Sequence, residues 1–120
     1  MTHTVSLLAD HKGFVKPRAN GDEYMVDAVI DITEYNNAAG GGNVITASSL
    51  GLSSITSAYI TGQENLTYTG VIMCAAETGL YESNDSFNLL VQQLLQATPA
   101  EETDADTTTY SFRVRVHGQL

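Results

Sequence analysis

Two stretches near the ends of the chain alternate apolar and polar residues with a period of two. In residues 24–33, four apolar side chains fall on one face of an extended strand, while Asp27, Val29 and Asp31 fall on the other. Residues 109–117 show the same alternation and are rich in the β-branched and aromatic residues that strands favour. Each stretch therefore predicts a half-buried strand, and two such strands constrain the chain to a β-sheet fold.

Shorter strand-like segments lie between these two. We expect Ser57–Thr61 and residues 66–75 to pair as antiparallel neighbours across the turn-prone residues 62–65. A second hairpin is expected between residues 78–82 and 87–92. With residues 4–8 and 44–46 added, the chain holds about eight short strands. This number is typical of an all-β, single-domain β-sandwich of jelly-roll type.

Residues 86–97 fit two kinds of secondary structure. Five apolar residues recur there at helical spacing, which would suit an amphipathic helix. We favour a strand, because the flanking elements are β and the preceding turn is short.

A bend interrupts the strand pattern in the middle of the chain. We expect residues 48–53 to form a helical turn that closes one end of the sandwich with Leu50 and Leu52. Gly51 lies between these two leucines, where a change of chain direction suits glycine.

The length of 120 residues suits one domain with a single core. We divide it into an N-terminal arm and loop, residues 1–23, and a β-sandwich domain, residues 24–120. The start of the chain lacks a signal-peptide pattern, and no apolar run approaches the roughly 18 residues of a membrane span. We expect synthesis in a cytoplasm and no membrane contact.

The chain is strongly acidic. Five Lys and Arg stand against fourteen Asp and Glu, which leaves a formal net charge of −9. Such a charge repels the phosphate backbone of nucleic acids and the surface of anionic lipid. Nucleic acid is therefore not an expected partner.

The residue types that carry catalysis or bind metals do not form a recognisable pattern. The acidic residues 101–106 lack the glycine turn and the distal glutamate of an EF-hand loop, and the three histidines form no paired motif. No serine occupies a Gly-x-Ser-x-Gly elbow, and the glycines at 40–42 precede no phosphate-loop lysine. We expect no enzyme activity, no cofactor and no metal.

The carboxylates of Asp27 and Asp31 lie about 13 Å apart along one strand face, at the usual rise of about 3.3 Å per residue. That separation is too large for the carboxyl pair of a glycosidase. We expect these carboxylates to face Arg113 and Arg115 across strands or to stay in water.

In VIDITEYNNAAGGGNVITASSLGLSSI, residues 29–55, a strand ends in a tyrosine- and glycine-rich turn. A short strand follows, and then a Leu-Gly-Leu segment that feeds the next strand. This order resembles that of small virion structural proteins of tailed bacteriophages. YSFRVRVHG, residues 110–118, is similar to the last strand of such proteins. Together the two segments cover under a third of the chain.

This resemblance implies a jelly-roll sandwich that decorates the outside of a capsid and cements it, commonly as a homotrimer. The partner would be the major capsid protein, and the location would be the virion. In decoration proteins an N-terminal arm often touches the shell, so Lys12, Phe14, Lys16 and Arg18 are the expected shell contacts. We expect an oligomer contact at Val29, an apolar residue on an outward strand face.

A different class of function stays open beside this one. The chain could be a receptor- or carbohydrate-binding module of a phage tail or fibre. Its contact residues would then be Tyr59, Tyr68 and Tyr81, since tyrosine combines an apolar ring with a polar hydroxyl.

Overall fold

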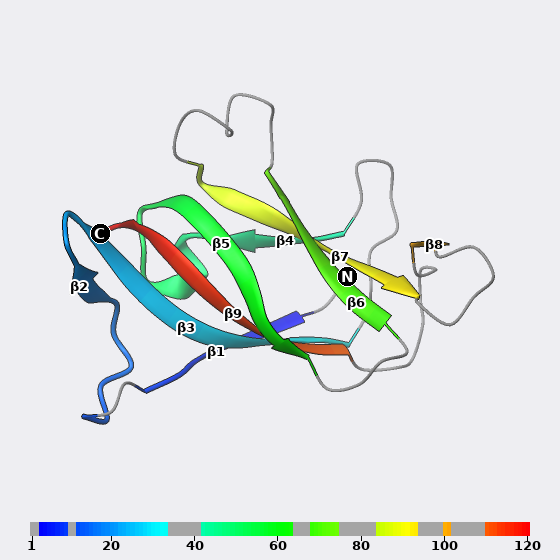
Figure 1. Ribbon diagram of the computed structural model, residues 1–120. Coiled ribbons are helices and arrows are strands. Elements are labelled where there is room, and N and C mark those ends of the chain that lie inside the picture. The colour runs from blue at the N-terminus through cyan, green and yellow to red at the C-terminus, as the bar shows by residue number, and fades with distance from the viewer. Residues whose placement is uncertain are drawn as a thin grey trace.

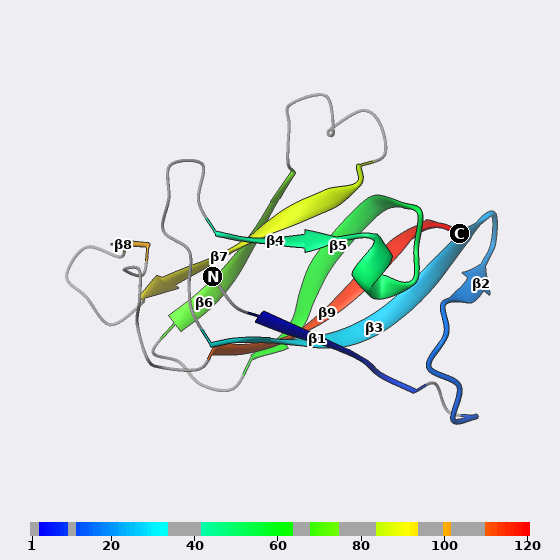
Figure 2. The same cartoon turned by 180° about the vertical axis from the view of Figure 1, so that it is seen from behind.

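The computed structural model describes residues 3–9, 12–33, 42–63, 68–74, 84–93, 100–101 and 110–120. These residues form two antiparallel sheets that pack face to face as a β-sandwich (Figures 1 and 2). The described part of the chain contains no α-helix, only a single 3₁₀ turn. The predicted all-β sandwich is thus confirmed.

Each sheet is built from segments far apart in the sequence. The five-stranded sheet has the order β1-β3-β9-β5, and β2 also pairs with β3. Its strands are β1 (His3–Leu7), β2 (Arg18–Asn20), β3 (Glu23–Ile32), β5 (Ser54–Gln63) and β9 (Tyr110–Gln119). The four-stranded sheet has the order β4-β7-β6, and β8 pairs with β7. Its strands are β4 (Asn43–Thr46), β6 (Tyr68–Cys74), β7 (Ser86–Gln93) and β8 (Ala100–Glu101).

The connectivity is of the jelly-roll type. Strands β3, β4, β5 and β6 alternate between the two sheets. Strand β7 then inserts between β4 and β6, and β9 inserts between β3 and β5. The last strand of the chain is therefore a central strand of its sheet.

The core lies between the sheets and follows the predicted alternation. On β3 and β9, apolar residues in register, such as Ile30 and Phe112, are buried together. The four-stranded sheet covers them with side chains from β4 and β7, including Ile45 and Leu89. Strands β3, β4, β7 and β9 each bury every second residue over most of their length, which is why the period of two was a sufficient signal.

The predicted helical turn is confirmed at one end of the sandwich. The 3₁₀ turn Ser48–Leu50 leads into Gly51, whose φ of 79° lies in the left-handed region that favours glycine. Leu50 and Leu52 are both buried in the core. They close the space between the sheets where the chain passes from β4 to β5.

One predicted strand pairing is wrong. The strands expected at 57–61 and 66–75 are β5 and β6, and they belong to different sheets (Figure 1). Gly70 explains the arrangement, because a Cβ there would fall against Ile60 and within 2.9 Å of the Phe112 ring. The missing side chain lets β6 approach β5 and β9 across the core.

For other predicted segments, the structure describes only part of the residues. Strand β7 shows that residues 86–93 are extended rather than helical, whereas residues 94–97 and the strand expected at 78–82 lie outside the described residues. In the N-terminal arm, β1 pairs with residues 28–32 and β2 with residues 23–25 of β3. The short strand β2 was not predicted.

Candidate interaction surfaces

The outer face of the five-stranded sheet carries a cluster of ion pairs centred on Asp27. The Asp27 side chain is only 7% exposed. Arg115 donates from Nε to Oδ1 at 2.8 Å and from Nη2 to Oδ2 at 3.1 Å. Arg18 on β2 donates from Nη2 to Oδ2 at 3.0 Å. The expected pairing of this carboxylate with Arg115 is confirmed.

These hydrogen bonds determine the protonation state of the carboxyl group. The bond from Arg115 lowers the pKa of Asp27 most, and burial opposes it by raising the pKa. The bond from Arg18 and the charges of both guanidinium groups add to the lowering, so the pKa lies below its usual value. Asp27 is therefore held as an anion with two cationic neighbours.

A second polar group lies further along the same face, toward the C-terminal end of β9. The His117 Nδ1 atom is 3.2 Å from Glu23 Oε1, and Thr56 donates a hydrogen bond of 2.9 Å to Glu23 Oε2. The Nδ1 contact lacks hydrogen-bond geometry and is an ion pair only when the imidazole is protonated. The exposed Tyr59 ring stacks on His117 with 6.0 Å between ring centroids.

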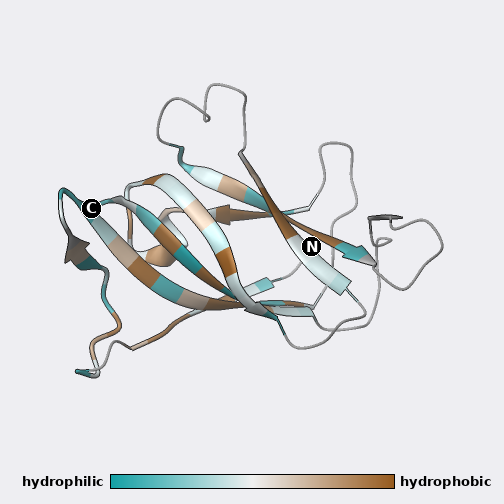
Figure 3. Ribbon diagram, in the orientation of Figure 1, coloured by the Kyte–Doolittle hydropathy of each residue, from teal (hydrophilic) through white to brown (hydrophobic). Residues whose placement is uncertain are grey.

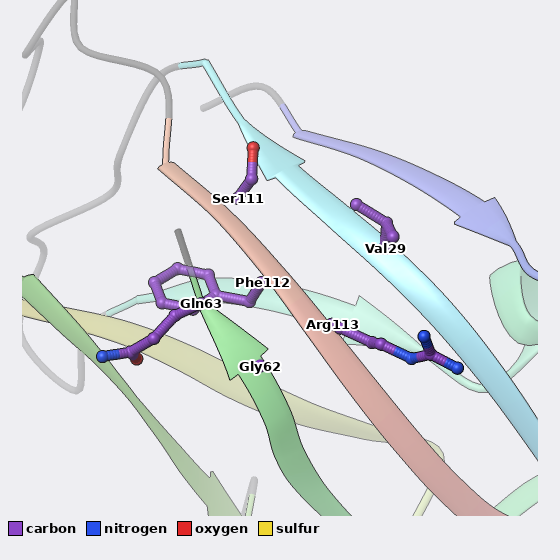
Figure 4. Close-up of a pocket in the computed structure, with 6 residues that line it drawn as sticks. All are labelled: Val29, Gly62, Gln63, Ser111, Phe112 and Arg113. Carbon is purple, nitrogen blue, oxygen red and sulfur yellow. The ribbon is translucent and has the colours of Figure 1, made fainter. Parts of the chain in front are cut away.

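A shallow hollow of about 300 Å³ opens beside these clusters (Figure 4). It is lined by Val29, Gly62, Gln63, Ser111, Phe112 and Arg113. Strand β5 shifts register between Ile60 and Gly62, so that Gly62, which has no side chain, lies opposite Arg113. The Arg113 side chain extends from β9 toward β3 across this hollow (Figure 4).

The expected oligomer contact, Val29, lies in this hollow on the outward face of β3. It is in register with Arg113 and is only partly buried. Two neighbouring polar groups are already engaged, because Ser111 Oγ donates to Asp31 and Gln63 Nε2 donates to the Tyr68 carbonyl oxygen. The hollow thus combines an apolar side chain with a guanidinium group.

The outer face of the four-stranded sheet is different in character. Val44, Asn88 and Met73 lie in register as one row across β4, β7 and β6. Val44 is 49% exposed and Met73 is 47% exposed. Val71 and Leu90 form the next apolar pair, and the second half of β6 is brown in the hydropathy colouring of Figure 3. The described outward side chains of β4, β6 and β7 carry no charge.

This apolar outer face was not predicted from the sequence. The run Val71–Cys74 is apolar without interruption, so a period of two cannot separate its inward residues from its outward ones. An unbroken apolar run on a short strand was the signal that could have indicated an apolar surface on both faces.

The expected shell contacts fall into two groups. Lys12, Phe14 and Lys16 lie in the exposed segment between β1 and β2, where Phe14 is 65% exposed. Arg18 lies on β2 and its guanidinium group is bound to Asp27. Lys12, Phe14 and Lys16 are thus exposed in one segment, whereas the Arg18 side chain is bound to the outer face of its own sheet.

The three tyrosines proposed for ligand contact do not gather in one place. Tyr59 is exposed on the outer face of the five-stranded sheet. Tyr68 is only 3% exposed and packs edge-to-face against Tyr110, with ring centroids 4.6 Å apart. It is a core residue and is not available to a ligand, while Tyr81 lies outside the described residues.

No helix in the described part of the chain is long and apolar enough to cross a bilayer. No group of three His, Cys, Asp or Glu side chains in that part of the chain could hold a metal ion. A scan against protein-family models, a search of curated proteins and a search of solved structures each found no match.

Proposed function

We propose that this chain is a non-enzymatic structural protein of a bacteriophage virion. Its role would be that of a capsid decoration, or cement, protein that binds the outer head surface and stabilises it. The observation that carries the proposal is the uncharged, partly apolar outer face of the four-stranded sheet, with Val44 and Met73 exposed. A sheet face with exposed apolar side chains and no charge suits contact with another protein.

The charge distribution supports a protein partner over a polyanion. The net charge of −9 disfavours DNA and anionic lipid, and two of the five basic residues are bound to Asp27. The exposed Lys12, Phe14 and Lys16 are the proposed contacts to the major capsid protein. Many copies on one shell would each need only a weak contact, because the shell presents many sites together.

We assign the contact of a homotrimer to the hollow around Val29. A three-fold assembly uses a heterologous contact, in which one surface of a chain meets a different surface of its neighbour. A hollow with an apolar wall and a guanidinium group suits a protruding side chain of an acidic chain such as this one. The number of chains in this assembly, three, comes from the resemblance to decoration proteins, which are commonly homotrimers.

The proposal is tested by co-sedimentation of the purified chain with phage heads assembled without it. We expect binding that saturates at a fixed ratio of chains to head subunits. The double variant F14A/K16A should bind less, while the variant T4K, changed on an exposed residue of β1, should bind like the wild type. A folded chain that stays in the supernatant at every salt concentration would refute the proposal.

One observation favours the second candidate, a carbohydrate- or receptor-binding module. The exposed Tyr59 ring is stacked on His117 and could offer an aromatic surface to a sugar ring. A glycan array separates the two functions. Binding of a defined glycan that is lost in Y59A would favour the module over the decoration protein.

A further inference from the structure

Strand β6 is a sheet edge without the usual protection. In the described part of the chain its backbone ladder is formed with β7 alone, through seven consecutive residue pairs without a register shift. Its first two residues, Tyr68 and Thr69, also hydrogen-bond to the Gln63 side chain of β5. Its sequence, Tyr68–Cys74, contains no charged residue and no proline. Natural sheets protect exposed edges with bulges, charges or proline, since an unpaired edge is a template for another strand.

The edge of the other sheet on the same side of the molecule shows such protection. Strand β5 has two register shifts, one between Ile55 and Ser57 and one between Ile60 and Gly62. Bulges of this kind bend a strand and interrupt the regular order of its backbone hydrogen-bonding groups. Strand β6 is thus less protected than β5, and with 7 residues it is longer than the other end strands β1, of 5 residues, and β4, of 4 residues. Among the described strands it offers the longest uninterrupted edge to which another strand can add.

The outward side chains of β6 match an added strand of the same sequence. Val71 is the middle residue of Tyr68–Cys74, and Thr69, Val71 and Met73 share the outward face. We propose that β6 pairs in antiparallel fashion with β6 of a second copy, about a two-fold axis at Val71. Val71 then lies opposite its own copy, and Thr69 of each chain lies opposite Met73 of the other.

Charge explains why the occupant is a second copy of this acidic chain. Two chains that each carry a net charge of −9 repel one another wherever carboxylates oppose each other. The two-fold arrangement at β6 brings no charged pair together, because neither β6 nor the outward residues of β7 carry a charge. It also covers the exposed Met73 and joins two four-stranded sheets into one continuous sheet.

This contact goes beyond the proposed function, because it needs no shell. It would join chains in pairs whether or not the trimer contact at Val29 forms. A failure at β6 therefore leaves the decoration proposal standing, and a failure to bind heads leaves the β6 contact standing.

A cysteine at the two-fold axis tests the contact directly. Paired Cα atoms of antiparallel strands lie about 4.5–5.5 Å apart, within the range of about 4.4–6.8 Å that a disulfide accepts. In a C74A background, we expect V71C to form a covalent dimer under mild oxidation, with at least tenfold more cross-linked product than T4C on the edge strand β1. Equal cross-linking of the two variants would overturn the proposal.

A charge at the same position provides a second test. The variant V71K puts two ammonium groups directly opposite each other. The fold persists, because residue 71 is only partly buried and faces outward, so the lysine side chain can reach solvent. We expect the mass from light scattering to fall by half relative to the wild type, with an unchanged circular dichroism spectrum, while T4K keeps the wild-type mass. A V71K variant that is folded and has the wild-type mass would contradict the contact.

Discussion

Asp27 on β3 and Arg115 on β9 lie directly opposite each other, and the guanidinium group binds both carboxylate oxygens, at 2.8 and 3.1 Å. A bidentate pair of this kind fixes the two side chains in one geometry. Arg18 adds a third hydrogen bond at 3.0 Å and ties the short strand β2 to the same carboxylate. The ion pairs thus connect three strands on a face that is otherwise open to solvent.

Replacing Asp27 by Asn should destabilise the protein by about 2 kcal/mol, the scale of hydrogen bonds to a charged group. The change leaves two guanidinium groups without their anion. The free energy of unfolding in urea at pH 7 measures the loss. The variant K16Q removes a charge from the exposed segment between β1 and β2, outside this ion pair, and should cost less than about 0.5 kcal/mol. Equal losses in the two variants would contradict the assigned role.

The cost of the Asp27→Asn change should depend on pH. The folded-state pKa of Asp27 is lowered, chiefly by the hydrogen bond from Arg115. The resulting stabilisation is complete above the unfolded-state value of about 3.9 and is lost as the pH falls through the folded-state pKa. In urea titrations from pH 6 to pH 2, wild type and D27N should converge at the acid end. A constant difference in stability between wild type and D27N across this pH range would argue against a lowered pKa of Asp27.

His3 should add a pH dependence nearer neutrality. Burial lowers its pKa, and its Nδ1 atom lies 3.5 Å from the Asn43 side-chain nitrogen. Because the folded state favours the neutral imidazole, stability is complete above the unfolded-state value of about 6.5 and declines as the pH falls below it. The variant H3Q should lose this slope between about pH 7 and pH 5 in thermal unfolding. The same slope in H3Q and wild type would assign it to another group.

Two glycines of the five-stranded sheet should respond differently to alanine. A Cβ at Gly118 would fall on the Ser54 carbonyl oxygen and lie 3.2 Å from Ile55 Cα, so the backbone of β5 must move. A Cβ at Gly62 would meet only Arg113 Cβ, at an ordinary 3.8 Å. We expect G118A to cost about 1–3 kcal/mol or more, on the scale of overpacking, and G62A to cost much less. Chemical denaturation of both variants checks this order, and a reversal would contradict the packing of β5 on β9.

Val29 tests the proposed trimer contact. A lysine there would lie opposite Arg113 on β9 and between Asp27 and Asp31 along the outward face of β3, so the two carboxylates offset the like charge of Arg113. We expect V29K to weaken the oligomer and to keep the circular dichroism spectrum of the wild type. An unchanged mass in light scattering would remove the trimer contact from this hollow.

Much of the fold could be predicted from the sequence because local patterns determine it. The alternation in β3 and β9 identified the core face, and the Leu50 and Leu52 pair marked the closed end. The cross-strand pair of Asp27 and Arg115 followed from placing acidic and basic residues on outward strand faces.

The remaining features depend on contacts between distant segments. Strands β5 and β6 are close in sequence but belong to different sheets, and Gly70 leaves the space in which β6 approaches Ile60 across the core. Strand β2 is only three residues long and is tied to the sheet by the bond from Arg18 to Asp27. The outward position of Met73 was hidden in a continuous apolar run.

The solution mass of the purified wild-type chain, measured by size-exclusion chromatography with light scattering, tests most directly whether this protein assembles with copies of itself. We predict a concentration-dependent assembly of three chains, or of six where the β6 contact joins two trimers. A single-chain mass at every concentration, with an intact β-sheet spectrum, would contradict it.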